Sequence, residues 1–211
     1  MGFNYLVIEG NIGVGKTSLA KSLANDTNAR LILEQFEENP FLPLFYQNKD
    51  KYAFPVELTF LADRYQQLNK QIAPQELFQE KTISDYYFMK SLLFSRETLK
   101  KNEYSLYRRL FDIIQQQIPK PDLYVYLHAH TDKLLANISR RGREYEKNLT
   151  TVYLEKIQNG YFEYFKSNPD MTFVVIDVNE VDFVNNSDDY QRIKNIILAK
   201  QYFKGMNMII P

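Results

Sequence analysis

A glycine-rich stretch near the start of the chain has the spacing of a phosphate-binding loop. Residues 10–17 read GNIGVGKT, which satisfies the pattern G-x-x-x-x-G-K-[ST]. In such a loop the backbone N–H groups surround phosphate oxygens, the lysine reaches the β- and γ-phosphates, and the last hydroxyl binds Mg²⁺. We therefore expect nucleotide phosphates to be bound by Gly10, Asn11, Ile12, Gly13, Val14, Gly15, Lys16, Thr17 and Ser18.

Two acidic residues, Glu34 and Asp85, are each the last residue of a predicted strand. In a parallel α/β sheet the carboxyl ends of the strands form the crevice in which ligands bind. Asp85 is placed to help Thr17 hold Mg²⁺, either directly or through water. Glu34 could accept a proton from a substrate hydroxyl, or it could be a solvated acid in a cluster with Glu37 and Glu38, and its position alone leaves both open.

The elements that must position these residues alternate between strands and helices. Apolar runs predict strands at residues 3–9, 30–34, 81–85, 123–128 and 172–178. Helical spacing and capping residues predict helices at 17–29, 54–71, 86–101, 103–118, 131–141, 150–166 and 188–201. This alternation predicts an α/β fold with a five-stranded parallel sheet and helices on both faces, in one domain spanning 1–211. Residues 205–211 are apolar and uncharged, and we expect them to pack on this chain or on a neighbour.

The composition excludes several classes of protein. Lys and Arg together number 26, as do Asp and Glu, so the zero net charge argues against a nucleic-acid-binding protein. The absence of cysteine excludes disulfides, thiolate metal sites and cysteine nucleophiles. No apolar run reaches the length of a membrane-spanning helix, and the N-terminus lacks the pattern of a signal peptide. We expect a cytoplasmic protein with neither a membrane nor a nucleic-acid partner.

The phosphate-binding loop alone does not separate a switch, a motor and a kinase. A GTPase would also need a D-x-x-G switch and an N-K-x-D motif that recognises the base, and the sequence contains neither. The nearest match, Asn48-Lys49-Asp50-Lys51, has its aspartate one place early. The choice therefore depends on segments beyond the loop.

Three further segments carry charged and aromatic residues in a distinctive order. They are LEQFEENPFL at 33–42, with LFY at 44–46; TISDYY at 82–87; and RRGREYE at 140–146, introduced by IPKPD at 118–122. Together with the loop they resemble the deoxynucleoside kinase family, especially the bacterial deoxyadenosine and deoxyguanosine kinases, from about residue 3 to residue 200. The resemblance implies a P-loop kinase-like three-layer fold, an arginine-rich lid at about residues 140–149, and a homodimer.

The resemblance also implies which residues are catalytic. Glu34 would be the general base that takes the proton of the substrate's 5′-hydroxyl. Lys16, Arg141 and Arg143 would stabilise charge on the transferring phosphoryl group. The segment at 177–187 resembles the one that holds the adenine of the donor.

The chain departs from the family at two positions. Many members have an E/D-R-S triplet whose arginine contacts the 5′-oxygen and the catalytic carboxylate, whereas this chain reads Asp85-Tyr86-Tyr87. A further arginine of the lid helix is replaced by Asn137, for which Arg140 could substitute.

The same resemblance places the sugar and base of the substrate. Glu146 would accept the sugar 3′-hydroxyl with Tyr46 as its partner, and Glu57 stands where many members have a glutamine that recognises the base. An ionised carboxylate only accepts hydrogen bonds, which suits the ring N–H and exocyclic amine of guanine, so we expect deoxyguanosine to be preferred. Alternatively, Glu57 merely pairs with Arg64, seven residues later, and the shape of the pocket selects the base. The expected substrate-binding residues are Glu34, Tyr46, Glu57, Arg64, Asp85 and Glu146.

Together these features predict an ATP-dependent kinase for the 5′-hydroxyl of purine deoxynucleosides, with Mg²⁺ held by Thr17 and Asp85. One alternative is a nucleoside monophosphate kinase, which should have arginines near the second strand, where this chain is acidic. Another is a non-catalytic nucleotide-sensing module, which the missing arginine at Tyr86 favours.

Overall fold

The computed structural model describes residues 3–35, 39–72, 81–199 and 201–211. Their contacts divide the chain into two units, each with its own interior. Unit 1 comprises the described parts of Met1–Leu33, Glu76–Asp85 and Lys120–Pro211, and unit 2 comprises those of Glu34–Gln75 and Tyr86–Pro119. That all of residues 1–211 form one domain remains a prediction.

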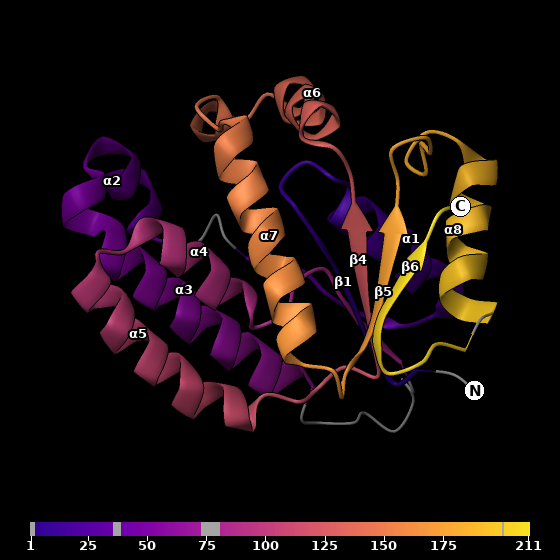
Figure 1. The fold of residues 1–211 in the computed structure, drawn as a ribbon, viewed down its shortest axis with the longest axis horizontal. Coiled ribbons are helices and arrows are strands. Elements are labelled where there is room, and N and C mark those ends of the chain that lie inside the picture. The colour runs from indigo at the N-terminus through magenta and orange to yellow at the C-terminus, as the bar shows by residue number, and fades with distance from the viewer. Residues whose placement is uncertain (1–2, 36–38, 73–80, 200) are drawn as a thin grey trace. The chain divides into compact units, whose positions relative to one another are not determined.

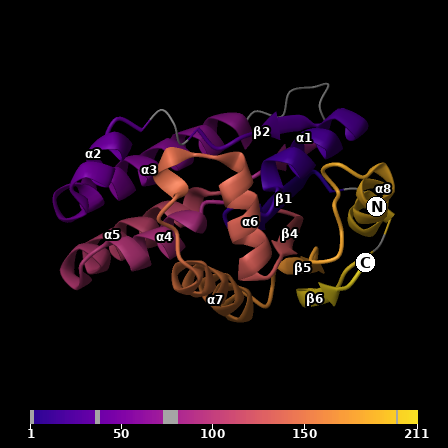
Figure 2. The ribbon, with the colours of Figure 1, turned by 90° about the horizontal axis from the view of Figure 1, so that it is seen from above.

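Unit 1 is built on a parallel sheet with strand order β2-β3-β1-β4-β5-β6 (Figure 1). The strands are β1 (Tyr5–Gly10), β2 (Arg30–Ile32), β3 (Thr82–Ser84), β4 (Leu123–His128), β5 (Thr172–Asp177) and β6 (Gly205–Ile209). The helices of the unit are α1 (Lys16–Thr27), α6 (Thr131–Arg141), the 3₁₀ turn η2 (Glu144–Glu146), α7 (Thr151–Ser167) and α8 (Ser187–Ala199). Helices α1 and α8 lie on one face of the sheet and α7 on the other (Figure 2), which confirms the predicted α/β class.

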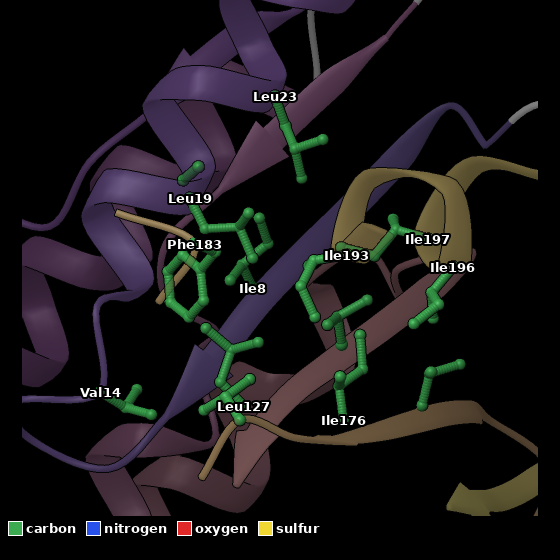
Figure 3. Close-up of a cluster of buried hydrophobic side chains, with 14 of the residues drawn as sticks. Ile8, Val14, Leu19, Leu23, Leu127, Ile176, Phe183, Ile193, Ile196 and Ile197 are labelled. Atoms are coloured by element: carbon green, nitrogen blue, oxygen red, sulfur yellow. The ribbon is translucent and has the colours of Figure 1, made fainter. Parts of the chain in front are cut away.

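The two faces of the sheet have different cores, because successive side chains of a strand point to opposite sides. Val125 and Leu127 of β4 belong to an aliphatic layer under α1 and α8 (Figure 3). On the other face Tyr124 and Tyr126 pack edge-on against Phe165 of α7, with ring centroids 5.5 and 5.4 Å apart. Both faces are therefore buried, as a sheet between two helical layers requires.

Strand β6 shows that the prediction of five strands is wrong, since the sheet has six. It pairs with β5 from Gly205 opposite Thr172 to Ile209 opposite Ile176. Its side chains alternate between half-buried and exposed, and it lies at the edge of the sheet. Asn207 interrupts the apolar residues of β6, so the strand lacks the continuous apolar run from which the inner strands were predicted. Of the two expectations for this segment, packing on this chain is confirmed.

The register of the strands brings two predicted ligand-binding positions to one edge. Val7 of β1 lies opposite Ser84 of β3, so the loop after β1 and Asp85 both follow the carboxyl ends of neighbouring strands. This is the edge at which parallel sheets bind their ligands.

Unit 2 consists of helices α2 (Leu42–Gln47), α3 (Lys49–Ile72), α4 (Lys90–Thr98) and α5 (Lys101–Ile114) with the 3₁₀ turn η1 (Gln115–Gln117). Helix α2 was not predicted because Pro40 and Pro43 suggested a break, yet Pro43 lies in its first turn, where a missing N–H costs nothing. Helix α3 begins before the predicted residue 54, and the Asn48 side chain accepts the Lys51 N–H at its start. No helix in the described ranges is long and apolar enough to cross a membrane.

Candidate active site

Two glycines adopt the backbone conformations that the loop between β1 and α1 requires. Gly13 and Gly15 have φ angles of +83° and +97°, a region that glycine adopts readily and other residues do not. A Cβ on Gly13 would lie 2.8 Å from the Leu134 carbonyl oxygen, and one on Gly15 would lie 2.9 Å from the Phe183 ring. The loop is therefore fitted closely against α6 and against the segment that follows β5.

Side chains complete the hydrogen bonds of this loop. Asn11 Nδ2 donates to a carbonyl oxygen of α7 at 2.7 Å, and Asn137 Nδ2 donates to the Gly13 carbonyl at 2.9 Å. Lys16 Nζ donates to the Asn11 carbonyl at 2.9 Å. Asn137 thus anchors the phosphate loop, and Arg140 donates to its Oδ1 at 3.0 Å. The sequence showed only that Asn137 replaces an arginine of the lid helix, and it did not indicate this hydrogen bond to the phosphate loop.

The two predicted metal ligands meet. The Thr17 hydroxyl donates to Asp85 Oδ2 at 2.5 Å, and Asp85 is only 5% exposed. A hydroxyl and a carboxylate are oxygen donors of the kind Mg²⁺ prefers, and Mg²⁺ usually takes its other ligands from water and substrate phosphates. Among the described residues no group of three or more His, Cys, Asp or Glu side chains could hold a metal ion. The Thr17–Asp85 pair supplies two oxygen donors that fit Mg²⁺.

Both arginines of the predicted lid form ion pairs with one carboxylate, that of Glu146. Arg141 donates to Glu146 through Nε at 3.1 Å and through Nη2 at 2.5 Å, and Arg143 Nη1 lies 3.7 Å from the same carboxylate. The Glu146 side chain is 8% exposed, whereas those of Arg141 and Arg143 are 38% and 32% exposed. The guanidinium groups are thus accessible while held by a buried partner.

The segment predicted to hold the adenine of the donor is fixed by a lysine that the sequence did not point to. Lys133 Nζ donates to three carbonyl oxygens at 2.5 to 3.0 Å, those of Val178, Asn179 and Val181. Phe183 of the same segment packs on Gly15. The segment and the phosphate loop therefore support each other.

In unit 2, Glu34 lies between two cations. Arg64 of α3 donates to Oε1 through Nε at 3.0 Å and Nη2 at 2.7 Å, while Lys90 of α4 donates to Oε2 at 2.5 Å. Arg64 Nη1 also donates to Ser91 Oγ at 2.8 Å. The Glu34 and Lys90 side chains are each 12% exposed and that of Arg64 is 6% exposed. Glu34 is therefore a buried, paired carboxylate and not a solvated acid, and Lys90 is a partner that sequence reasoning missed.

These cations determine the ionisation of Glu34. Burial alone raises the pKa of a carboxyl group. The charges of Lys90 and Arg64 and their hydrogen bonds outweigh that effect and lower the pKa of Glu34 from 4.5 to about 2. Glu34 is consequently ionised at neutral pH but is a weak proton acceptor while both cations remain.

Glu57 has the opposite environment. It is 5% exposed, and within the described residues no hydrogen-bond donor reaches its buried Oε2 atom. Burial raises the pKa of Glu57 from 4.5 to about 7, against the attraction of Arg64 and a hydrogen bond from Thr98. All three of the Arg64 donor groups that form hydrogen bonds point to Glu34 and Ser91. The geometry therefore does not favour the alternative in which Glu57 serves only to pair with Arg64.

The structure brings most of the predicted residues into three groups. In unit 1 these are Lys16 and Thr17 with Asp85, and Arg141 and Arg143 with Glu146. In unit 2 the group is Glu34 with Arg64, and Glu57 lies two turns before Arg64 on the same helix, α3. Tyr46 lies on α2 with its side chain 42% exposed, where its ring meets Phe45.

A phosphate loop after β1, a hydroxyl–carboxylate pair beside it and arginines on a following helix define a nucleotide-binding P-loop protein. The family model described as deoxynucleoside kinase matches residues 6–201. The chain is 34% identical over 196 residues to the deoxyguanosine kinase of Bacillus subtilis strain 168, covering 90% of this chain and 93% of that one. It is 31% identical over 210 residues to the deoxyadenosine kinase of Dictyostelium discoideum, covering 98% and 83%.

Its fold is similar to that of the deoxyadenosine kinase from M. mycoides with bound dATP, with a TM-score of 0.77 at 23% identity over 92% of this chain and 98% of the other. The chain belongs to the deoxynucleoside kinase family, and it is an enzyme of that class. The resemblance inferred from the sequence is confirmed. Family membership argues against both a nucleoside monophosphate kinase and a non-catalytic sensor.

The close fit of the phosphate loop predicts the effect of adding one methyl group. Gly13→Ala should weaken ATP binding at least tenfold, because the Cβ would collide with the Leu134 carbonyl and shift the loop. Gly205→Ala is the matched control: Gly205 also has a positive φ, +86°, but its Cβ would lie 4.0 Å from the nearest atom. Titration calorimetry with ATP should show a loss in the first variant and wild-type affinity in the second. Equal affinities in both variants would contradict the argument from packing.

Proposed function

We propose that this enzyme transfers the γ-phosphoryl group of ATP to the 5′-hydroxyl of a purine deoxynucleoside, in deoxynucleotide salvage. Deoxyguanosine is the favoured substrate and deoxyadenosine the next. The observation that carries the choice of guanine is the buried Glu57 carboxylate, whose Oε2 has no donor partner among the described residues. The deoxyguanosine and deoxyadenosine kinases to which the chain is similar support a purine substrate.

The donor is held by unit 1. On ATP binding, Lys16 exchanges the Asn11 carbonyl for the β- and γ-phosphates, and the loop's backbone N–H groups take the remaining phosphate oxygens. Thr17 and Asp85 would hold Mg²⁺, which when bound neutralises charge on the phosphates.

The acceptor is activated by Glu34. Its carboxylate takes the proton of the 5′-hydroxyl as that oxygen attacks the γ-phosphorus. Arg64 holds the carboxylate through two hydrogen bonds to the same oxygen, Oε1, and Ser91 holds Arg64 in turn. Such an anchored carboxylate presents its second oxygen in a defined direction.

The lid acts by exchange. Arg141 and Arg143 move from Glu146 to the transferring phosphoryl group, where positive charge stabilises the transition state. Glu146 is then able to accept a hydrogen bond from the sugar 3′-hydroxyl. The family resemblance assigns Tyr46 to the same hydroxyl.

The base is recognised by Glu57. In its ionised form the carboxylate accepts hydrogen bonds from the guanine ring N–H and the exocyclic amine. Adenine presents a ring acceptor instead, and a protonated Glu57 could donate to it. A pKa of about 7 leaves both forms populated near neutral pH, so Glu57 can serve either purine.

The family likeness also supports a homodimer that works in the cytoplasm, with the deoxynucleoside and ATP as its small-molecule partners. Size-exclusion chromatography coupled to light scattering would test the dimer directly.

The proposed metal site predicts a change in the Mg²⁺ requirement. Asp85→Asn should raise the half-saturating Mg²⁺ concentration about tenfold, because a neutral amide is a weaker partner for a hard cation than a carboxylate. Initial rates at fixed ATP over a range of Mg²⁺ concentrations measure this, with the exposed Asp188→Asn as the control. An unchanged Mg²⁺ dependence would remove Asp85 from the metal site.

If Glu34 is the base, replacing it should lower kcat and leave ATP affinity nearly unchanged. Glu34→Gln should lower kcat with deoxyguanosine about 100-fold or more, since an amide cannot take up the proton. ATP affinity should remain within threefold, because the donor is held by residues of unit 1. The exposed Glu155→Gln is the matched control. Wild-type kcat in Glu34→Gln would exclude Glu34 as the base.

The raised pKa of Glu57 predicts that base preference changes with pH. Glu57 is neutral below its pKa and ionised above it, so kcat/KM for deoxyguanosine should rise as pH increases through about 7. The ratio of kcat/KM for deoxyguanosine to that for deoxyadenosine should be at least about 30-fold lower at pH 5.5 than at pH 8.5, because the ionised fraction of Glu57 falls by that factor. In Glu57→Gln this ratio should be independent of pH and should shift toward adenine. A Glu57→Gln variant that keeps the full guanine preference would show that another feature selects the base.

A further inference from the structure

Lys90 has no assigned role, yet it is among the most enclosed cations of unit 2. It is the first residue of α4, its side chain is 12% exposed, and its ammonium lies 5.5 Å from the centre of the Phe94 ring. Its Nζ donates to Glu34 Oε2, the carboxylate oxygen that Arg64 does not use. Burying an ammonium group is unfavourable unless a partner compensates it.

The cluster around Glu34 contains more positive charge than the carboxylate can balance. One carboxylate faces two cations, Arg64 from α3 and Lys90 from α4, so the three groups together carry one excess positive charge. Among the described residues, the other titratable groups near Arg64 are Glu57 and Tyr107. Burial raises the pKa of Tyr107 and raises that of Glu57 to about 7, so the excess charge is complete when Glu57 is protonated. A buried site with excess positive charge is suited to an anion or to negative charge that develops during a reaction.

The two cations differ in how firmly they are held. Arg64 uses its planar fork, with two hydrogen bonds to Glu34 and one to Ser91, and so has one fixed orientation. Lys90 has three N–H donors on a flexible stem, and the described residues accept one of them. Tyr86, which stands where many family members have an arginine, carries no positive charge, and its hydroxyl donates to Gln67 Oε1 at 2.6 Å. Lys90 is therefore the cation that can change partner.

We propose that Lys90 is a catalytic residue of this enzyme, whose ammonium passes from Glu34 Oε2 to the substrate's 5′-oxygen when the nucleoside binds. This inference rests on the assignment of Glu34 as the base. The exchange has two effects at once. It removes one of the two cations that suppress the basicity of Glu34, and it places positive charge on the oxygen that becomes negative as its proton departs.

The step balances without any further reactant. Glu34 takes the proton of the 5′-hydroxyl, and the 5′-oxygen forms its bond to the γ-phosphorus. The bond from the γ-phosphorus to the β,γ-bridging oxygen breaks, and that electron pair leaves with ADP. Lys90 keeps its three protons throughout and acts through charge and hydrogen bonding alone.

A chain without cysteine offers a direct test, because Lys90→Cys introduces its only thiol. Alkylation with 2-bromoethylamine rebuilds a side chain of lysine's length and charge, and alkylation with bromoethane gives an uncharged side chain of similar bulk. Mass spectrometry verifies complete reaction. The exposed Lys101→Cys passes through the same steps as the control.

We expect kcat with deoxyguanosine to fall about 100-fold in Lys90→Cys, to recover at least tenfold after aminoethylation, and not to recover after ethylation. If Lys90 only suppresses the basicity of Glu34, its removal makes Glu34 a stronger base, and kcat would stay the same or rise. If it only fills space, both alkylated forms would recover equally. Either result would overturn the proposal.

Lys90→Arg covers the case in which the cysteine variant does not fold. This variant keeps the charge and should retain at least a tenth of wild-type kcat, and a 100-fold loss in a form that still binds ATP normally would overturn the proposal. Glu34→Gln in the same assay separates the two claims. Full activity in Glu34→Gln would show that Glu34 is not the base. The role of Lys90 is tested separately, by whether aminoethylation of Lys90→Cys restores kcat.

Discussion

The charge balance around Glu34 is the constraint on which unit 2 depends. A carboxylate this enclosed is stable only when charged or hydrogen-bonding partners compensate it, and here the cations come from two helices. Arg64 contributes from α3, while Lys90 and Ser91 contribute from the first turn of α4. Removing one partner of such a buried pair typically costs about 3–5 kcal/mol, because the remaining charge is left without compensation. The same contacts that define the proposed base therefore hold the helices of this unit together.

Unit 1 follows the same principle with other groups. Lys16 donates to a carbonyl of its own loop, Thr17 donates to Asp85, and Arg141 binds Glu146. Each of these side chains already has a protein partner. Substrate binding is then an exchange of partners and not the satisfaction of unpaired groups, so the net gain in free energy per contact is small. What this arrangement provides is side chains that are oriented, and charges that are compensated, before the ligand arrives.

The sequence predicted what local patterns encode and missed what tertiary contacts decide. The phosphate loop was evident because its eight residues are contiguous, and Asp85 because it directly follows a buried strand. Lys90 could not be found, because it is 56 positions from Glu34 and shares no helix with it. Strand β6 was missed because its stability comes from pairing with β5 and not from its own pattern, and α2 because Pro43 suggested a break when it occupies a first turn. Asn137 was seen only as a missing arginine, since its bond to Gly13 exists only in the fold.

Arg64 lies near two carboxyl groups whose pKa values differ by about five units, at about 2 for Glu34 and about 7 for Glu57. A lowered pKa adds stability that is present above the unfolded-state value near 4.5 and disappears as pH falls toward 2, so Glu34 stabilises the protein at neutral pH. For Glu57 the sign is reversed: burial favours the neutral acid, and stability declines as pH rises from 4.5 through 7. One arginine cannot compensate both carboxylates, and its hydrogen bonds go to Glu34. A carboxylate at position 57 is therefore unfavourable for the unliganded protein at neutral pH, and a ligand that donates hydrogen bonds to it offsets that cost. Guanine has two such donors on one edge, which links the instability of this position to the selectivity proposed for it.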